Sequence, residues 1–255
     1  MAVREPAVAG RFYAADPDEL RREVQDHLAG VTLALPSQPP AVIVPHAGHI
    51  YSGPVAATAY AQMHSAQRVV IAGPAHYVPV AGLVAPRAQA WRTPLGLVEI
   101  DEGGIGDAGL PRDDYPHAPE HSLEVQLPFL QEQLAPGWRL LPILVGRAGP
   151  SEVADVLEPF LADPGTVVVL STDLSHYHRY ETALGQDRAT AQRIVSGDWQ
   201  GIADDDACGA YPLRGLLLAA QSRGGAIVQL DLRNSGDTAG PRDRVVGYGA
   251  FAVGP

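Results

Sequence analysis

Three histidines, His46, His76 and His176, each come a few residues after a short apolar run of the sequence. Asp173 lies between the third run and His176. Imidazole is both a common metal ligand and an acid–base group near neutral pH. Ligands of open α/β sheets bind beyond the carboxyl ends of the strands. If the three runs are neighbouring parallel strands, these four side chains converge at one edge of the sheet.

Cys208 is the single cysteine of the chain and completes a plausible ligand set. Two imidazoles and a thiolate suit iron, copper or zinc, whereas calcium and magnesium prefer oxygen ligands. The three aspartates at 204–206 disfavour a free thiolate by their negative charge. We therefore favour a metal-bound thiolate over a cysteine nucleophile.

Each of these residues also has an ordinary structural interpretation. A single histidine at a strand end is more often a hydrogen-bonding core or loop residue than a ligand, and a lone cysteine is more often a small buried apolar residue. Three histidines at three strand ends favour a site. His49 could line it or be merely exposed, and we expect His27, His64, His117 and His178 to be surface or helix residues.

The hydrophobic pattern alternates between strand-like and helix-like segments, which predicts an α/β fold. Strands that are apolar throughout indicate a mixed, mostly parallel central sheet covered by helices on both faces. We read the whole chain, 1–255, as a single domain. The predicted helices are 17–28, 55–63, 122–134, 151–161, 182–195 and 213–220. The predicted strands are 41–44, 68–72, 80–85, 97–100, 140–145, 167–170, 227–232 and 245–253.

Composition narrows the function classes. The chain is 46% hydrophobic with a net charge of −11 and has no basic run interleaved with aromatic residues. Such an acidic surface repels phosphate backbones and anionic lipids, so we expect neither nucleic acid nor a membrane as a partner. No apolar run approaches the roughly 20 residues that span a bilayer. One cysteine and an N-terminus without an apolar signal segment favour the cytoplasm. High Ala, Gly, Pro and Arg content without Lys is typical of a GC-rich bacterial genome.

Common motifs of other enzyme classes are absent from the sequence. It contains no G-x-S-x-G nucleophile elbow, no G-x-G-x-x-G fingerprint and no phosphate-binding loop of the G-x-x-x-x-G-K type. At the start of the predicted helix 122–134, the i, i+3 spacing of His121 and Glu124 puts both on one face. They could join the pocket.

Several short blocks, in order along almost the whole chain, resemble the Memo family, whose bacterial branch is the B component of the AmmeMemoRadiSam system. The blocks are Arg4–Tyr13, Pro45–Gly48, Tyr51–Gly53, Gly73–His76, Trp91–Gly96, Glu120–Glu124, Ser171–His176, Cys208–Gly209 and Val246–Ala250.

The resemblance implies a fold similar to the class III extradiol dioxygenases, which use non-haem Fe(II). It implies a metal site of His46, His76 and Cys208, and it places His176 where the dioxygenases keep an acid–base histidine, with Asp173 beside it. The remaining pocket candidates of the matched blocks, expected to contact substrate or support the ligands, are His49, Tyr51, His121 and Glu124. His49 stands where an aromatic residue is expected, and Cys208 replaces the carboxylate ligand of the dioxygenases.

Three functions remain open at this point. The leading one is an Fe- or Cu-dependent oxidoreductase acting on a small organic substrate, with His176 moving protons. The second is a non-catalytic scaffold that binds a metal or a peptide. The third is hydrolysis by zinc-activated water, with zinc the less favoured metal. The resemblance also implies partnership with an AMMECR-type protein and a radical SAM enzyme.

Overall fold

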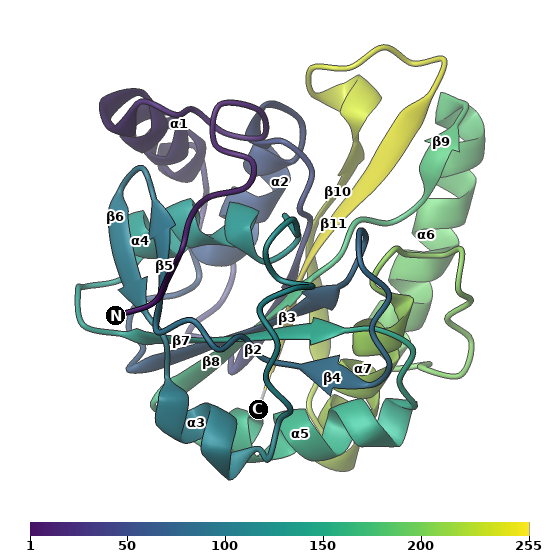
Figure 1. The fold of residues 1–255 in the computed structure, drawn as a ribbon. Coiled ribbons are helices and arrows are strands. Elements are labelled where there is room, and N and C mark those ends of the chain that lie inside the picture. The colour runs from purple at the N-terminus through teal and green to yellow at the C-terminus, as the bar shows by residue number, and fades with distance from the viewer. Residues whose placement is uncertain (255) are drawn as a thin grey trace.

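The computed structural model describes residues 1–254 and contains two sheets (Figure 1). The strands are β1 (Val3–Arg4), β2 (Ala41–Val44), β3 (Arg68–Pro74), β4 (Leu83–Val84), β5 (Ala90–Thr93), β6 (Gly96–Glu99), β7 (Arg139–Val145), β8 (Thr166–Ser171), β9 (His176–His178), β10 (Ile227–Asn234) and β11 (Val245–Val253). The helices are α1 (Pro17–Ala29), α2 (His49–Tyr60), α3 (Glu102–Asp107), α4 (Leu127–Gln133), α5 (Pro150–Ala162), α6 (Tyr180–Ser196) and α7 (Ala210–Ser222), with short 3-10 turns at Glu124–Gln126 and Ser235–Asp237.

The larger sheet has eight strands, seven of them in the order β10–β11–β2–β8–β3–β7–β4, and β9 pairs with β11. Its centre is parallel, because β2, β8, β3 and β7 all run the same way. β10, β11 and β4 are antiparallel to their neighbours. Nearly every residue of the central strands is buried, as expected where a sheet is covered on both sides. The predicted fold class is confirmed.

Helices cover both faces of this sheet (Figure 1). α1, α2 and α4 lie on one face, and α5 and α7 pack together on the other. α6 lies against β10 and β11, on the side that carries β9. Within residues 1–254, none of the helices has both the length and the apolar character that a bilayer-spanning helix requires.

Most predicted elements are present, and the differences occur where local signals mislead. α1 begins as expected, because the Asp16 carboxylate caps it by accepting from the amides of Asp18 and Glu19. α2 begins at His49 rather than residue 55, since Pro54 lies inside the helix instead of at its start. The predicted helix 122–134 divides into a turn, a 3-10 segment and the shorter α4.

Candidate metal centre

The carboxyl ends of three central strands bring the predicted site residues together. β8 lies between β2 and β3, and all three are parallel. Val44 at the end of β2 is level with Ser171 at the end of β8. The loops that leave these strands carry His46, His76 and Asp173, so the sheet edge gathers them as the sequence predicts.

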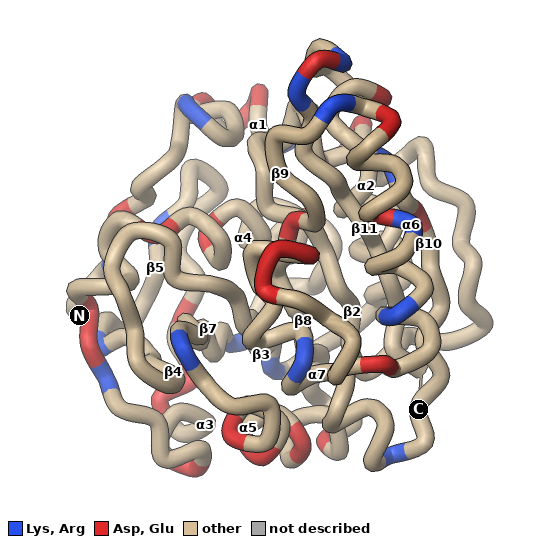
Figure 2. Tube along the Cα trace, turned by 90° about the vertical axis from the view of Figure 1, so that its right-hand side faces the viewer, with Lys and Arg blue, Asp and Glu red and all other residues tan. Residues whose placement is uncertain are grey.

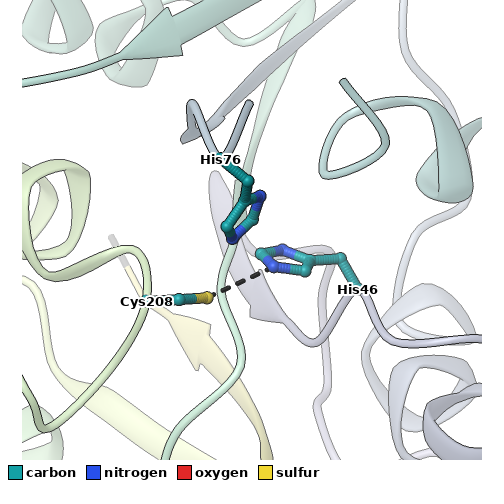
Figure 3. Close-up of side chains that lie close together, drawn as sticks. All are labelled: His46, His76 and Cys208. Carbon is teal, nitrogen blue, oxygen red and sulfur yellow. Dashed lines mark hydrogen bonds between the residues drawn. The ribbon is translucent and has the colours of Figure 1, made fainter. Parts of the chain in front are cut away.

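His46, His76 and Cys208 form a group whose ligand-capable atoms all lie within 4.8 Å of one another. The three side chains point toward a common centre, and Cys208 Sγ lies 3.2 Å from His46 Nε2 (Figure 3). A tetrahedral ion with Zn-like bond lengths would separate its sulfur and nitrogen ligands by about 3.5 Å. The group therefore fits one transition-metal ion with little rearrangement.

Cys208 reaches this group because its loop lies directly on the end of β8. The Cys208 amide donates to Asp173 O (3.2 Å), and the Asp173 amide donates to Cys208 Sγ (3.3 Å). The Gly209 amide donates to Thr172 Oγ1 (2.9 Å). A Cβ at position 209 would lie 2.8 Å from Thr172 Oγ1, so this close approach requires glycine.

Ser171 sets the tautomer of His46. The Ser171 hydroxyl donates its one hydrogen to Ser122 O (2.6 Å), so it must accept from the Nδ1–H of His46 at 2.8 Å. The Nε2 lone pair of His46 is then free to face Cys208. Burial, followed by the neighbouring imidazoles of His76 and His121, lowers the pKa of His46 well below its ordinary value. His46 is thus neutral at pH 7, as a metal ligand must be.

Glu120 orients His76 in the same way, and sequence reasoning did not select it. Its carboxylate accepts from the His76 ring Nδ1 (3.0 Å) and from the His76 amide. The amides of His121 and Ser122 also donate to it, at 2.8 and 2.9 Å. Burial acts to raise the pKa of Glu120, but the neighbouring imidazoles of His121 and His76 hold it well below its ordinary value. Its place in the Glu120–Glu124 block was the only signal in the sequence.

His76, Glu120 and His121 form a second group with metal-capable spacing. His121 Nδ1 lies 3.2 Å from Glu120 Oε1, and the rings of His76 and His121 stack at 4.8 Å. Both Glu120 oxygens already accept hydrogen bonds from the protein. We interpret Glu120 as a support that holds the two imidazoles in place, because a metal there would have to displace those bonds.

Asp173 and His176 lie beyond the end of β8, next to the ligand group. The Asp173 carboxylate accepts from the His46 amide at 2.7 Å, and burial raises its pKa. His176 Nδ1 lies 2.8 Å from Leu174 O, a carbonyl that can only accept, so His176 Nε2 is the free acceptor in its neutral form.

The thiol of Cys208 is not activated by its protein surroundings. Burial, and then the charge of Asp173, raise the pKa of this thiol to about 12. A cysteine nucleophile requires a lowered pKa, whereas a bound metal ion deprotonates its thiol ligand. This environment agrees with the sequence-based preference for a metal ligand over a free nucleophile.

A cavity of about 550 Å³ opens beside the ligand group. Its walls include His46 and His76, together with Asp173, His121 and His176. Tyr51 also lines it. The pocket is therefore of the size that holds a small organic molecule.

Two of the expected pocket residues lie elsewhere. The carboxylate of Glu124 is fully buried, pairs with Arg4 (2.7 Å) and accepts from the Tyr13 hydroxyl (2.6 Å). His49 packs against Phe129 and bonds Val125 O at 2.9 Å. Neither residue lines the cavity.

The expectation that His117 is a surface or helix residue is wrong. Its side chain is buried, it lies in a loop, and its Nε2 is 3.2 Å from Val84 O. The reason is the long-range packing of this loop, since Arg4 donates to His117 O at 2.8 Å. No local pattern around residue 117 indicates such a contact.

Known proteins are similar in sequence to this chain over nearly its full length. A MEMO1 family protein of Methanopyrus kandleri is 37% identical over 97% of this chain and 98% of its own. A MEMO1 family protein of Methanosarcina mazei is 34% identical over 99% of this chain and 100% of its own. One of Ignicoccus hospitalis is 36% identical over 98% of each chain. The family model described as Memo-like protein matches residues 4–252. This chain therefore belongs to the Memo family.

Proposed function

We propose that this chain is a metal-dependent oxidoreductase that acts on a small organic substrate, with iron or copper held by His46, His76 and Cys208. The observation that carries the proposal is the cavity of about 550 Å³ beside two of these ligands. A structural metal site is closed by its ligands, whereas a catalytic site leaves room for substrate. Zinc remains the less favoured metal.

The protein side chains have defined tasks in this proposal. A bound iron or copper ion supplies Lewis acidity and one-electron chemistry. Ser171 and Glu120 fix the ligand imidazoles, so that Nε2 of each is available. His176 exchanges a proton with the substrate through Nε2, since its Nδ1 is engaged by Leu174 O.

Metal content is the first test. The wild-type chain, purified without oxygen and without a His tag, should carry about one equivalent of iron or copper. His46→Ala and Cys208→Ala should both lose it. His178→Ala, which changes an exposed histidine of β9, is the control and should retain it. Absence of metal from the wild type after reconstitution would contradict the proposal.

His176→Ala separates proton transfer from metal binding. The variant should bind metal like the wild type and lose turnover, measured as oxygen uptake while aromatic diols and related compounds are screened. If the metal is lost as well, His176 belongs to the ligand set instead.

A non-catalytic scaffold is the second candidate, and the exposed rings of Tyr77 and Tyr177 at the cavity favour it. Aromatic side chains at a cavity rim also suit the binding of a peptide. Azide added to the loaded protein distinguishes the two functions. A changed metal absorption spectrum supports an open catalytic position, and an unchanged spectrum supports the scaffold.

We also propose, from the family resemblance, that the chain acts in the cytoplasm with an AMMECR-type protein and a radical SAM enzyme. A reducing compartment keeps Cys208 available as a thiolate ligand. Co-expression of the three chains and co-purification through a tag on the radical SAM enzyme tests this. Recovery of this chain only when its partners are present supports the partnership.

A further inference from the structure

The walls of the cavity are unusually aromatic. Five of its 17 lining residues are Phe or Tyr, whereas Phe, Trp and Tyr make up 6% of the chain. These five are Phe12, Tyr51, Tyr77, Tyr177 and Tyr248. Such faces favour a flat ligand with an apolar body, because ring stacking and apolar burial act together.

Arg244 is the one Arg among the residues that line this cavity, and the chain has no Lys. Within residues 1–254 its guanidinium has no ion pair, whereas Arg242 two residues earlier lies 3.7 Å from Asp237. Arg244 instead lies over the ring of Tyr177, 5.1 Å from its centroid. Figure 2 shows basic positions interspersed with acidic ones near β9, where the chain connects β10 to β11. An unpaired guanidinium at a cavity of an acidic protein is suited to an anionic ligand group.

The backbone around Arg244 departs from regular geometry on both strands. β9 pairs with β11, and the register shifts between Val245 and Val246, which opposes His176. Tyr177 has a φ of 61°, in the left-handed region that a bulky residue rarely adopts. Bulges and unusual backbone conformations are enriched at functional sites, where they redirect side chains. Tyr177 directly follows His176, and the register shift directly follows Arg244. His176 and Arg244 line the same cavity.

We propose that the substrate of this site is a small aromatic acid whose carboxylate binds Arg244. Its ring lies among the aromatic walls, and its far end faces His46 and His76. One guanidinium matches one carboxylate through two parallel hydrogen bonds. The carboxylate of Asp173 also lines this cavity and accepts from the His46 amide, so it lies at the histidine end. Its negative charge repels an anion there and so favours this orientation. The inference rests on the cavity of the proposed function and not on the identity of its metal.

Binding of three probes to the full-length protein tests the inference by titration calorimetry. The probes are 4-hydroxybenzoate, its neutral analogue 4-hydroxybenzamide, and cyclohexanecarboxylate, which is an acid without an aromatic ring. The wild type should bind 4-hydroxybenzoate about tenfold or more tightly than either of the others. Arg244→Gln should remove the preference for the acid over the amide and retain the metal.

Arg179→Gln is the matched control. Arg179 is an exposed Arg one residue beyond β9, it does not line the cavity, and its loss changes the net charge equally. This variant should keep the wild-type preference. Equal binding of acid and amide by the wild type, or no binding of the acid, would overturn the inference.

Cys208→Ala separates the inference from the proposed function. If the preference for the acid persists in Arg244→Gln and disappears in Cys208→Ala, the carboxylate binds the metal and the role of Arg244 is refuted, while the metal site stands. If Arg244 sets the preference in a chain that binds no metal, the inference stands and the metal-dependent function fails.

Discussion

The orientation of three of the four histidines that line the cavity depends on the partner of the Nδ1 atom. His46 donates to Ser171, His76 donates to Glu120, and His176 lies against Leu174 O. In each case Nε2 remains for a metal or a substrate. Such partners raise the basicity of a ligand and prevent the ring from turning. The partners of the ligands should therefore matter almost as much as the ligands themselves.

Glu120→Gln should lower the metal affinity about 10- to 100-fold. The two carboxylate oxygens of Glu120 accept from the ring and amide of His76 and from two further amides, at His121 and Ser122. Glutamine offers one acceptor oxygen, and its NH₂ would face donors, so the His76 ring would lose its fixed position. Competition with a chelator of known affinity measures the change.

Glu124→Gln is the control from the same sequence block. The fully buried Glu124 carboxylate binds Arg4 and Tyr13 instead of the cavity histidines. Breaking a buried ion pair costs about 3 kcal/mol or more of folding free energy. We expect a lower midpoint of unfolding with unchanged metal affinity in the folded protein. Equal loss of metal in both variants would contradict a specific role for Glu120.

At the level of elements, β11 holds the Leu174–Ser175 segment that leads into His176 at the start of β9. Gly247 accepts from the Leu174 amide and donates to Ser175 O, both at 2.8 Å. The Ser175 amide also donates to the buried carboxylate of Asp187 on α6, at 3.0 Å. β11, α6 and the Leu174–Ser175 segment therefore meet directly before His176.

Gly247→Ala should disrupt this junction. A Cβ at residue 247 would lie 2.2 Å from Oδ2 of the buried Asp187, whose Oδ1 is held by the Ser175 amide. Overpacking of this kind typically costs about 1–3 kcal/mol. We expect a loss of that size in denaturant unfolding, together with reduced turnover, because the Leu174–Ser175 segment shifts.

Gly185→Ala gives the matched comparison on α6 itself. Nothing lies within 4 Å of a Cβ at this exposed position, and its φ is not in the left-handed region. Alanine in a helix interior is more stable than glycine by about 0.5–1 kcal/mol. If stability rises with Gly185→Ala and falls with Gly247→Ala, the close contact at Gly247 causes the loss, rather than the exchange of glycine for alanine.

For the whole molecule, the sequence predicts the sheet and the ligand group. It does not predict the buried side chains that hold the ligands and the neighbouring loops in place. Apolar runs such as Ala41–Val44 specify buried strands locally, and parallel strand order then brings His46 and His76 together. Glu120 and His117 are placed by contacts between distant segments. Periodicity describes only one helix or strand at a time, so it assigned Glu124 to the pocket and could not identify Glu120.

Two buried histidines make the stability of the molecule dependent on pH. Burial lowers the pKa of both His49 and His117 to about 4, from an ordinary 6.5. Glu23 and His27 are the titratable neighbours of His49. The charged and titratable neighbours of His117 are Arg4, Asp114 and Glu120. Nδ1 of both histidines has no hydrogen-bond partner within residues 1–254, so protonation in the folded state places a charge in an unsuitable site.

The sign of this effect follows from proton binding. Between pH 6.5 and about 4 the unfolded chain binds protons at these histidines and the folded chain does not, so acid favours unfolding. The stability that each neutral histidine contributes should be fully present above pH 6.5. Between pH 7 and pH 5, the free energy of unfolding should fall by about 2 kcal/mol for each of them. Denaturant unfolding at half-unit steps of pH measures the loss, which should level off above pH 7.

His49→Phe tests the contribution of one of these two residues. A phenylalanine ring can occupy the space beside Tyr13 and Phe129 without a titrating group, although the bond to Val125 O is lost. The variant should therefore be less sensitive to acid by about 2 kcal/mol between pH 7 and pH 5, whatever its stability at pH 7. Parallel curves for the variant and the wild type would show that the acid sensitivity arises elsewhere, because only a titrating group can change the slope of stability with pH.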